Sequence, residues 1–480
     1  MVALVKVKAR KPDDLKGLRV TVMGLGTKGG GVETVKYLVR HKAKVKVTDI
    51  KTAEELEPSL KKIKDLPVEL ILGAHREEDF VDADLVIPNP DVPLSSKYLA
   101  MARSAKVQIE TDISLFFKFC PAPIASVTGT RGKSTTVTVA GQILRVKQED
   151  TVIAGNILRS PLADLDNLRS DTPVVLELSS WQLEGLARKK LSPHWALVTS
   201  IFPDHLNRYK SMDDYVSAKE LIFKYQKEND HLILSADDEI VSSFSEKSIG
   251  KLSWFSITKD LSQTKGDYIY VKNNEVTVNV NGKISNVLSW DELGGSGVHT
   301  RANMMAGTLL ALKMGASLES ARIVLKNFKG VPHRLESVKV ISGRTFIDDT
   351  TATIPEAVVA AINSFPDRRK ILITGGTDKK LNFEPLVSKL SDESVAHVIF
   401  LHGSATNKIL ELINREKSKH AKSPVVKTMK EALELAVKTS LPGDVILLSP
   451  GAASFELFRD EFDRGEQFKA IVNNLKDTDF

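Results

Sequence analysis

The stretch IASVTGTRGKST, residues 124–135, decides how the rest of the chain is interpreted. It begins with apolar and small residues that predict a buried strand, and a helical pattern starts near Ser134. Gly129 and Gly132 lie between these two elements and let backbone N–H groups surround a phosphate. Lys133 would neutralise the β- and γ-oxygens, and the hydroxyl that follows can hold Mg²⁺. A strand, a glycine-rich loop and a helix in this order predict a nucleotide-binding α/β domain.

This loop is shorter than the full P-loop motif, because Val127 stands where the longer motif has a glycine. A GxxGKS match on its own can arise by chance. Its position between an apolar strand and a helix favours phosphate binding over an ordinary turn.

Three candidate residues follow the loop along the chain. Glu177 ends the predicted strand VVLEL, where a carboxylate is placed to bind Mg²⁺, although a surface glutamate is an equal alternative. His205 follows the next strand and could bind a metal, but a lone histidine in a loop more often only hydrogen-bonds. Lys219, read by itself, is a lysine on the solvated face of a helix.

An earlier glycine pattern lies near the N-terminus. The strand RVTVM is followed by Gly24-x-Gly26-x-x-Gly29 and a helix, and a second strand ends at Asp49. Glycines allow a phosphate to approach a helix N-terminus, and an acidic residue at this spacing can accept from a ribose hydroxyl. The pattern alone indicates dinucleotide binding and an NAD-dependent oxidoreductase, with a ligand-free turn as the alternative.

Strands and helices alternate along most of the chain, which predicts an α/β protein with parallel sheets. The region 251–290 differs: alternation and Asn-Gly turn signals predict antiparallel hairpins there. Helical patterns occupy 301–314 and 318–328, and from 345 four more strands end in small or polar residues. Ligands bind at the carboxyl ends of parallel strands, so we expect the site residues at these ends.

Composition excludes several classes of protein. The chain has 480 residues, of which 42% are hydrophobic, and a net charge of only +6, which does not favour nucleic-acid binding. Its single cysteine, Cys120, excludes an intramolecular disulfide and a cysteine zinc cluster. Charge interrupts the short apolar stretch at the N-terminus, and no apolar run approaches a membrane span, so we expect a cytoplasmic protein without a signal peptide.

The order of motifs resembles the Mur ligase superfamily over about residues 18–470. The motifs that carry the resemblance are GTRGKST, AGN, LELSSWQLE, DHLNRY, an SAK lysine, GVHTRAN, PHR, DDTTAT, GGTDK and SPGAAS. SPGAAS followed by FDRG points to the member that adds D-glutamate, and the DNPR signature of the diaminopimelate-adding sibling is absent from the sequence.

The resemblance implies three domains. These are a Rossmann-like UDP-substrate domain (1–112), a central P-loop-type ATPase domain (113–330) and a Rossmann-like C-terminal domain for the amino acid (331–480). It implies an ATP-dependent amide ligase that adds D-glutamate to UDP-N-acetylmuramoyl-L-alanine through an acyl phosphate, in peptidoglycan precursor synthesis. The implied enzyme is a monomer that uses ATP and two Mg²⁺ sites, with no nucleic-acid or membrane partner.

Site residues follow from the resemblance by position in the motifs. The implied catalytic residues are Lys133, Glu177, His205 and Lys219. The implied ATP contacts are Gly129, Thr130, Arg131, Gly132, Lys133, Ser134, Thr135, Asn303, Arg334 and Asp349. The implied UDP-substrate contacts are Gly26, Thr27, Lys28, Asp49, Ile50, Asn89, Asn156 and Ser180. The implied D-glutamate contacts are Thr353, Lys379, Ser454 and Phe455.

The resemblance also implies the metal ligands. Ser134 and Glu177 would hold one Mg²⁺ ion, and His205 and Lys219 would serve the second. Lys219 matches the family's carbamylated lysine, in which an uncharged amine captures CO₂ and becomes a carboxylate able to hold or orient a metal ion.

The sequence departs from the family pattern at six places, none of which removes one of the four implied catalytic residues. The departures are Arg131, Asn89-Pro90-Asp91, Asn207, Thr300, Thr351 and the pair Glu461-Phe462. We therefore expect the ligase chemistry to be retained, whereas Asp91, Thr351 and Glu461 leave open which amino acid is accepted. The alternatives are a sibling ligase, the NAD-dependent oxidoreductase, and a nucleotide-gated binding protein without catalysis.

Overall fold

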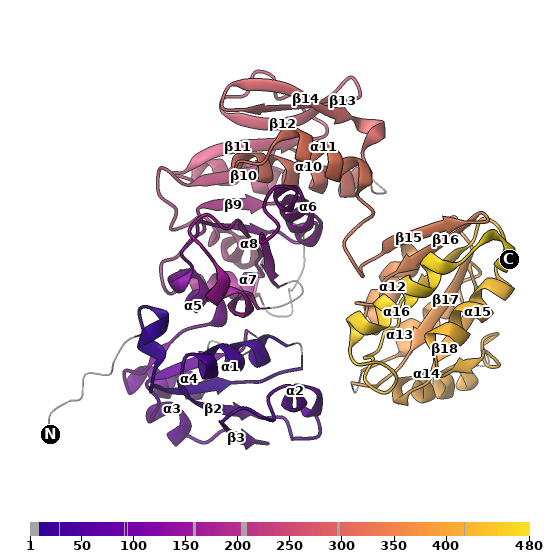
Figure 1. Ribbon diagram of the computed structural model, residues 1–480, viewed down its shortest axis with the longest axis horizontal. Helices are drawn as coiled ribbons and strands as arrows, with labels where there is room; N and C mark the ends of the chain where they lie inside the picture. The colour runs from indigo at the N-terminus through magenta and orange to yellow at the C-terminus, as the bar shows by residue number, and fades with distance from the viewer. Residues whose placement is uncertain are drawn as a thin grey trace. The chain divides into compact units, whose positions relative to one another are not determined.

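The computed structural model describes residues 9–480, apart from 28, 91, 94, 157–159, 203–208, 295–297, 380 and 417 (Figure 1). The chain divides into two units, Met1–Phe328 and Lys329–Phe480. Unit 1 contains a five-stranded and a nine-stranded sheet, and unit 2 contains a six-stranded sheet. The predicted α/β class is confirmed.

The first sheet of unit 1 is parallel and has the strand order β3-β2-β1-β4-β5. The order reverses at β1, which pairs with β2 on one side and β4 on the other, so a crevice opens beyond the carboxyl ends of β1 and β4. The strands are β1 (Arg19–Met23), β2 (Lys44–Asp49), β3 (Val68–Leu72), β4 (Leu85–Pro88) and β5 (Gln108–Ile109), and the helices are η1 (Pro12–Leu15), α1 (Gly30–Arg40), α2 (Glu57–Lys61), α3 (Glu78–Val81), α4 (Lys97–Ser104) and α5 (Asp112–Phe119).

The second sheet has the order β14-β13-β12-β11-β10-β9-β6-β8-β7. Strands β6 and β8 are buried along their whole length, as parallel strands covered on both faces are. The strands are β6 (Ile124–Thr128), β7 (Val152–Gly155), β8 (Val174–Glu177), β9 (Trp195–Val198), β10 (His231–Ser235), β11 (Lys251–Ser256), β12 (Asp267–Lys272), β13 (Glu275–Val280) and β14 (Lys283–Ser289). The helices are α6 (Lys133–Arg145), η2 (Pro161–Ala163), η3 (Leu165–Asn167), α7 (Ser180–Ala187), α8 (Met212–Glu220), α9 (Glu239–Ser243), η4 (Phe244–Glu246), η5 (Trp290–Glu292), α10 (Val298–Lys313) and α11 (Leu318–Asn327).

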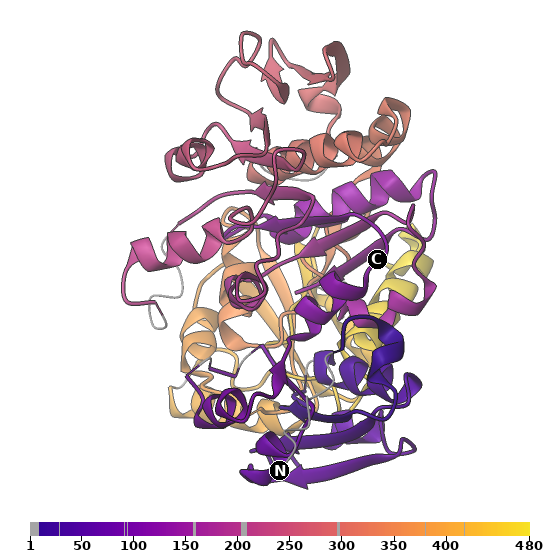
Figure 2. The ribbon, with the colours of Figure 1, turned by 90° about the vertical axis from the view of Figure 1, so that its left-hand side faces the viewer.

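The expected hairpins of 251–290 form only in part. Strands β12, β13 and β14 are antiparallel, as predicted. Strand β11 is instead parallel to both of its neighbours, so the prediction was wrong for this strand. Strand β11 continues the parallel series with Phe255 buried, whereas the antiparallel strands β13 and β14 lie at one edge of this sheet, at the top of Figure 2.

The sheet of unit 2 has the order β15-β16-β20-β17-β18-β19, parallel except for the edge strand β15. The four predicted strands are confirmed as β16, β20, β17 and β18, while the edge strands β15 and β19 were not predicted. The strands are β15 (Glu336–Ile341), β16 (Arg344–Asp348), β17 (Lys370–Gly375), β18 (Val395–Leu401), β19 (Val425–Val426) and β20 (Val445–Leu448), and the helices are α12 (Pro355–Asn363), α13 (Glu384–Leu390), α14 (Ser404–Arg415), α15 (Met429–Thr439), α16 (Glu461–Asn474) and η6 (Asp477–Asp479).

One apolar core runs through both sheets of unit 1. It includes Val20 of the first sheet, Leu176 of the second, and Ile113 and Phe116 of the connecting helix α5. Unit 2 instead has separate cores on the two faces of its sheet. Burial of apolar surface therefore joins the first two sheets into one body.

Within the described part of the chain, no helix combines the length and the apolar character that crossing a lipid bilayer requires.

Candidate active site

The glycine-rich loop between β6 and α6 has a conformation that only glycine adopts easily. Gly129 and Gly132 have φ of +143° and +86°, and Gly132 is the N-cap of α6. A Cβ atom on Gly129 would lie 2.0 Å from Oγ1 of Thr199, so the loop also needs glycine for space. Lys133 folds back over this loop, and its Nζ donates to the carbonyl oxygens of Gly129 at 3.1 Å and Thr130 at 2.9 Å. A phosphate placed at this helix N-terminus would meet both the backbone N–H groups and the ammonium group.

Glu177 and Ser134 meet beside this loop. Glu177 ends β8, is 3% exposed, and its Oε2 accepts from Oγ of Ser134 at 2.6 Å. Its Oε1 accepts from Nδ2 of Asn156 at 3.2 Å, and no described cation forms an ion pair with it. A buried carboxylate costs free energy unless its charge is compensated. Carboxylate and hydroxyl oxygens are ligands that Mg²⁺ prefers, so these two side chains fit a Mg²⁺ ion.

Asn156 is held against Glu177 through the backbone as well. Its N–H donates to the carbonyl oxygen of Glu177 at 2.8 Å. The preceding Gly155 has φ of +103°, and a Cβ atom there would lie 2.2 Å from that same carbonyl oxygen. The AGN motif therefore brings the ends of β7 and β8 together and places the Asn156 amide on the candidate metal ligand.

Lys219 is buried next to the same loop rather than solvated. It lies on α8, is 2% exposed, and its Nζ donates to Oγ1 of Thr128 at 3.3 Å. Its Nζ also lies 5.3 Å from the ring centroid of Tyr215, whose hydroxyl lies 3.1 Å from Oγ1 of Thr130. The interpretation of Lys219 as a surface lysine is therefore wrong, because α8 packs this side chain against the end of β6.

Asn303 on α10 covers the other side of the loop. A Cβ atom on Gly132 would lie 2.2 Å from Oδ1 of Asn303, and the Asn303 carbonyl oxygen accepts from Oγ1 of Thr136 at 3.3 Å. The structure therefore brings Lys133, Ser134, Glu177, Asn156, Lys219 and Asn303 around one glycine loop. Thr135 is half-buried on the first turn of α6, and Arg131 is exposed, with its carbonyl oxygen accepting from Oγ1 of Thr199 at 2.6 Å.

The first glycine loop lies at the crevice between β1 and β4. Asp49 is 5% exposed and uses its carboxylate inside the protein. Oδ2 accepts from the N–H groups of Leu25 at 2.8 Å and Gly26 at 3.2 Å, and Oδ1 accepts from Lys51 at 3.0 Å. Asp49 thus fixes the shape of the loop.

The remaining predicted UDP-substrate residues surround this crevice only in part. Nδ2 of Asn89 lies 3.4 Å from the carbonyl oxygen of Gly24, and Ile50 is 68% exposed next to Asp49. Thr27 is half-buried in the loop itself. Ser180 is buried on the first turn of α7, which follows strand β8 and its candidate metal ligand Glu177.

Unit 2 gathers three loops at the carboxyl ends of its strands. The backbones of Thr377 and Ala453 form an antiparallel bridge, with N–H···O distances of 2.9 and 3.0 Å. Ser454 is 3% exposed, and its Oγ has no hydrogen-bond partner among the described residues. Lys379 is exposed on the loop of Thr377, and Thr353 lies in the loop that follows β16. An unpaired buried hydroxyl among these loops is a feature expected of a ligand site. Phe455, the fourth residue predicted there, is half-buried directly after Ser454.

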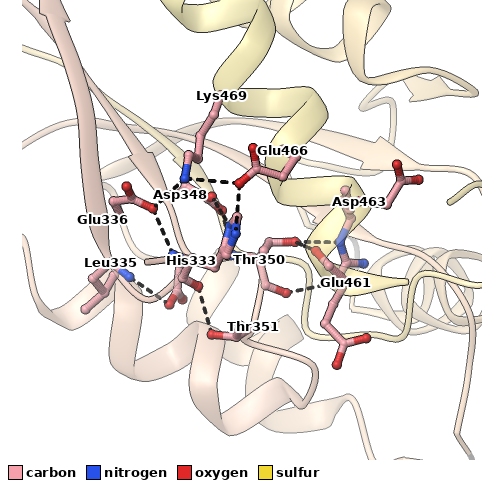
Figure 3. A network of polar contacts seen from close by, with 12 residues as sticks. His333, Leu335, Glu336, Asp348, Thr350, Thr351, Glu461, Asp463, Glu466 and Lys469 are labelled. Carbon is pink, nitrogen blue, oxygen red and sulfur yellow. Dashed lines mark hydrogen bonds and ion pairs between the residues drawn. The ribbon is translucent and has the colours of Figure 1, made fainter. Parts of the chain in front are cut away.

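The PHR turn of unit 2 is strained and is held by a polar network. His333 and Leu335 have φ of +62° and +46°, a conformation that costs free energy in residues other than glycine. Figure 3 shows His333 with its Nδ1 at 2.7 Å from Oδ2 of Asp348 and its Nε2 at 3.1 Å from Oε1 of Glu466. Arg334, between the two strained residues, is exposed.

Asp349 is buried directly after β16. Its Oδ2 accepts from Oγ of Ser449 at 2.8 Å and its Oδ1 from the N–H of Leu335 at 3.1 Å. Burial raises the pKa of Asp349 to about 7, against the opposing effect of these two hydrogen bonds. The carboxyl group therefore changes charge near neutral pH.

Two predicted site residues, Lys28 and His205, lie outside the described residues, as do Asp91 and Asn207. The sequence reasoning gave no role to Thr128, Thr199 or Arg464, which hold Lys219, the glycine loop and the loops of unit 2. Two of these are threonines at strand ends, a signal that could have been used. The third belongs to FDRG, which had served only to compare family members.

Comparison with known proteins agrees with this geometry. Three family descriptions match the chain: "Mur ligase MurD-like, N-terminal domain" at residues 18–111, "Mur ligase middle domain" at 127–311, and "Mur ligase, glutamate ligase domain" at 333–451. The first covers the loop of Asp49, the second the loop of Lys133, and the third most of the loops of unit 2.

Similar proteins match over almost all of their length. The UDP-N-acetylmuramoylalanine–D-glutamate ligase of Roseiflexus sp. is 39% identical over 96% of this chain and 99% of its own. The enzymes of the same name from Borreliella burgdorferi and Clostridioides difficile are 38% and 34% identical, each over 96% of this chain and 99% and 100% of their own.

Two solved structures share the fold. These are a murein peptide ligase from Psychrobacter arcticus, with 14% identity and a TM-score of 0.52, and UDP-N-acetylmuramate-alanine ligase from Thermotoga maritima, with 20% identity and a TM-score of 0.52. Each match covers 96% of this chain and 100% of the other. From the arrangement of the glycine loops and from these matches along the chain, the protein belongs to the Mur ligase family.

Proposed function

We propose that this protein is an ATP-dependent ligase that adds D-glutamate to UDP-N-acetylmuramoyl-L-alanine. The observation that carries the proposal is the group formed by Lys133, Ser134 and Glu177 at one helix N-terminus, with Oγ of Ser134 2.6 Å from Oε2 of Glu177. The names of relatives at 34–39% identity support the choice of substrates. We further propose that the enzyme is a cytoplasmic monomer with domain boundaries near residues 112 and 330.

The glycine loop of α6 binds the phosphates of ATP in this proposal. Backbone N–H groups of the loop and Nζ of Lys133 donate hydrogen bonds that stabilise the negative charge on the γ-phosphate. Asn303, which packs on Gly132, would contact the adenine of ATP. Catalysis of this kind depends mainly on positioning and on charge neutralisation.

Ser134 and Glu177 would hold one Mg²⁺ ion, which neutralises phosphate charge when bound. His205 and Lys219 would serve a second ion, with Lys219 carbamylated. Burial of Lys219 at 2% exposure supports the modification, because a desolvated amine loses its proton more readily and only the neutral amine reacts with CO₂.

The reaction proceeds in two steps. A carboxylate oxygen of the UDP-substrate attacks the γ-phosphorus of ATP, which forms an acyl phosphate and releases ADP. The unprotonated amine of D-glutamate then attacks the acyl carbon, and inorganic phosphate leaves from the tetrahedral intermediate as the amide forms. Phosphorylation is needed because a free carboxylate is a poor electrophile.

The UDP-substrate would bind at the first glycine loop and D-glutamate at the loops of unit 2. Exposed Ile50 offers an apolar surface to the uridine base, and Asn156 contacts the sugar side. Lys379 supplies a cation for a glutamate carboxylate, and the unpaired hydroxyl of Ser454 supplies a hydrogen bond. Arg334 and Asp349 would contact ATP.

The oxidoreductase alternative loses its main support. It required Asp49 to accept from a ribose hydroxyl, but both oxygens of this carboxylate accept from backbone N–H groups instead. It also leaves the loop of Lys133 unexplained. The sibling-ligase alternative adds a different amino acid, so a panel of amino acids tests it.

Phosphate release from ATP with UDP-N-acetylmuramoyl-L-alanine tests the proposal against a panel of amino acids and a control without amine. We expect release that requires D-glutamate. Release with another amino acid would keep the ligase chemistry and replace D-glutamate. A lack of release with every amino acid would reject the ligase and favour a binding protein.

Replacement of Lys219 tests its proposed carbamate separately. We expect Lys219→Ala to be inactive and to recover part of its activity with added short carboxylic acids, which substitute for the missing carboxylate. Lys224→Ala, on the same stretch of chain, is the control and should keep its activity without additives. Full activity of Lys219→Ala without additives would rule out an essential carbamate.

A further inference from the structure

The FDRG motif places an arginine inside unit 2. Arg464 lies on α16 and is 0% exposed, the largest side chain among those that are fully buried. Its neighbour Gly465 allows the helix to come close, because a Cβ atom there would lie 2.4 Å from Nδ1 of His333 and 2.6 Å from Cγ2 of Thr350. The helix is thus packed directly on the loop that follows β16 (Figure 3).

The guanidinium group of Arg464 joins two loops. Nε donates to Oγ1 of Thr350 at 2.9 Å, and Nη2 donates to the carbonyl oxygen of Thr350 at 2.9 Å. Nη1 donates to the carbonyl oxygen of Ala452 at 3.3 Å. The loop of Ala452 is bridged in turn to Thr377, so one side chain and one backbone bridge hold all three loops.

The charge of Arg464 is not matched by an ion pair with any described residue. Its three acceptors are a hydroxyl and two carbonyl oxygens, all of them neutral. Burial lowers the pKa of Arg464 to about 10, which leaves the group charged at neutral pH. The carboxylates of Glu461 and Asp348 lie near enough to favour the charged form, although neither forms an ion pair with Arg464. A buried cation is costly, and an anion bound nearby would reduce this cost further.

The loops that Arg464 holds are the ones that carry the proposed amino-acid contacts. Thr353 follows Thr350 in the first loop, and Ser454 follows Ala452 in the second. The buried hydroxyl of Ser454 has no partner among the described residues, which independently indicates that a polar ligand binds here.

We propose that Arg464 is a positioning residue that holds these two loops in register for one amino acid and whose buried positive charge favours an amino acid with two carboxylates. This inference rests on the proposed function. It gives the FDRG motif of α16 a role at the proposed amino-acid contacts.

Arg344 provides a matched control. It is 9% exposed in the same unit, and its guanidinium also donates only to neutral oxygens: Oγ of Ser440 at 2.8 Å, the Ser440 carbonyl at 3.0 Å and the Ser342 carbonyl at 2.8 Å. It starts β16, whereas the loop of Thr350 follows the other end of that strand. Loss of Arg344 therefore removes a buried arginine without touching the loops.

The experiment measures KM and kcat of the full chain for Arg464→Met, Arg464→Lys, Arg344→Met and Arg344→Lys. We expect Arg464→Met to raise the KM for D-glutamate by at least about tenfold and to change the KM for ATP by less than about twofold. Arg464→Lys keeps the charge but loses the planar group, so its KM for D-glutamate should lie between those of the wild type and Arg464→Met. The Arg344 variants should lose thermal stability with unchanged KM.

A second readout is the preference for D-glutamate over D-glutamine, measured as the ratio of kcat/KM values. Arg464→Met should reduce this preference, and the Arg344 variants should keep it. An unchanged KM and preference in folded Arg464→Lys or Arg464→Met would overturn the inference. If Arg464→Met does not fold, Arg464→Lys carries the test.

The wild-type protein separates this inference from the proposed function. If it accepts another amino acid, D-glutamate addition fails, and the KM for the accepted amino acid tests Arg464 in the same way. If it turns over no amino acid, both are rejected.

Discussion

The two glycine loops of unit 1 share a backbone plan and differ in charge. Each follows a parallel strand and ends in a glycine N-cap with positive φ, +88° at Gly29 and +86° at Gly132. In the first loop a carboxylate, that of Asp49, occupies the N–H groups of Leu25 and Gly26. In the second an ammonium group, that of Lys133, covers two carbonyl oxygens.

The difference teaches that a glycine pattern specifies a turn and not its ligand. Two N–H groups of the first loop are used by the protein itself, so it has fewer left for a phosphate. The second loop adds a cation and two oxygen ligands for a metal. The second loop is therefore the one suited to a nucleoside triphosphate, whereas the first offers fewer N–H groups to a phosphate.

The largest expected effect is that of removing the cation. Lys133→Ala should lower kcat/KM for ATP by about 1000-fold, because it removes a donor to the phosphate that changes charge in the transition state. Lys36→Ala is the control, since Lys36 lies on the helix after the first loop and pairs with Glu33 at the surface. Phosphate-release kinetics measure both. Near-normal turnover of Lys133→Ala would reject the ATP site.

The two N-cap glycines allow a matched test of space. Alanine costs about 1 kcal/mol at either position because of the positive φ. At Gly29 no atom of the described residues, apart from Gly29 and its chain neighbours, lies within 4 Å of the added Cβ, whereas at Gly132 it meets Oδ1 of Asn303 at 2.2 Å. Gly132→Ala should therefore lose activity roughly tenfold more than Gly29→Ala at similar cost in stability. Equal losses in the two variants would mean that Asn303 does not act at the loop.

Asp49→Asn tests whether the carboxylate shapes the first loop. An amide has one oxygen acceptor and adds donors that oppose the backbone N–H groups, so we expect a loss of about 1–3 kcal/mol in the free energy of unfolding. The KM for the UDP-substrate should rise and the KM for ATP should not. Asp237→Asn is the control, because Asp237 also accepts a backbone N–H, from Ile257, but follows β10 in the other sheet of unit 1. An unchanged KM for the UDP-substrate would mean that the first loop does not bind that substrate.

The smallest effect concerns pH at the first loop. Asp112 lies at a small hollow with Gly24, Gly30 and Gly31, and burial raises its pKa. A carboxyl whose pKa is higher in the folded state gives stability that is present at low pH and lost as pH rises through the folded pKa. Asp112→Asn should therefore gain stability over the wild type as pH rises. Thermal unfolding across a pH series measures this, and a constant difference would contradict it.

Much of the fold and part of the site could be predicted because both depend on local patterns. Strand and helix periods placed the parallel sheets, and the ends of β6 and β8 placed Lys133 and Glu177 near one another. Such reasoning works when residues lie at the same edge of a parallel sheet.

The rest depends on contacts between distant segments. Nothing near Asp49 indicates that its carboxylate turns back to its own loop. The pairing of β11 depends on neighbours rather than on its own alternation. Arg464 reaches Thr350 across 114 residues, and a charged residue on a helix is read as exposed until the packing is known. The burial of Lys219, a residue that the family resemblance had already singled out, is equally invisible in a short helical sequence.

The place of β20 in unit 2 has a consequence for synthesis of the protein. This strand, Val445–Leu448, is the last one in the sequence, yet it lies between β16 and β17 in the middle of the sheet. A chain emerging from the ribosome N-terminus first can complete the nine-stranded sheet of unit 1 while unit 2 still lacks its central strand. We expect unit 2 to fold only after almost all of the chain has been made. A nascent chain would therefore form the loop of Lys133 long before the loops of unit 2 are joined.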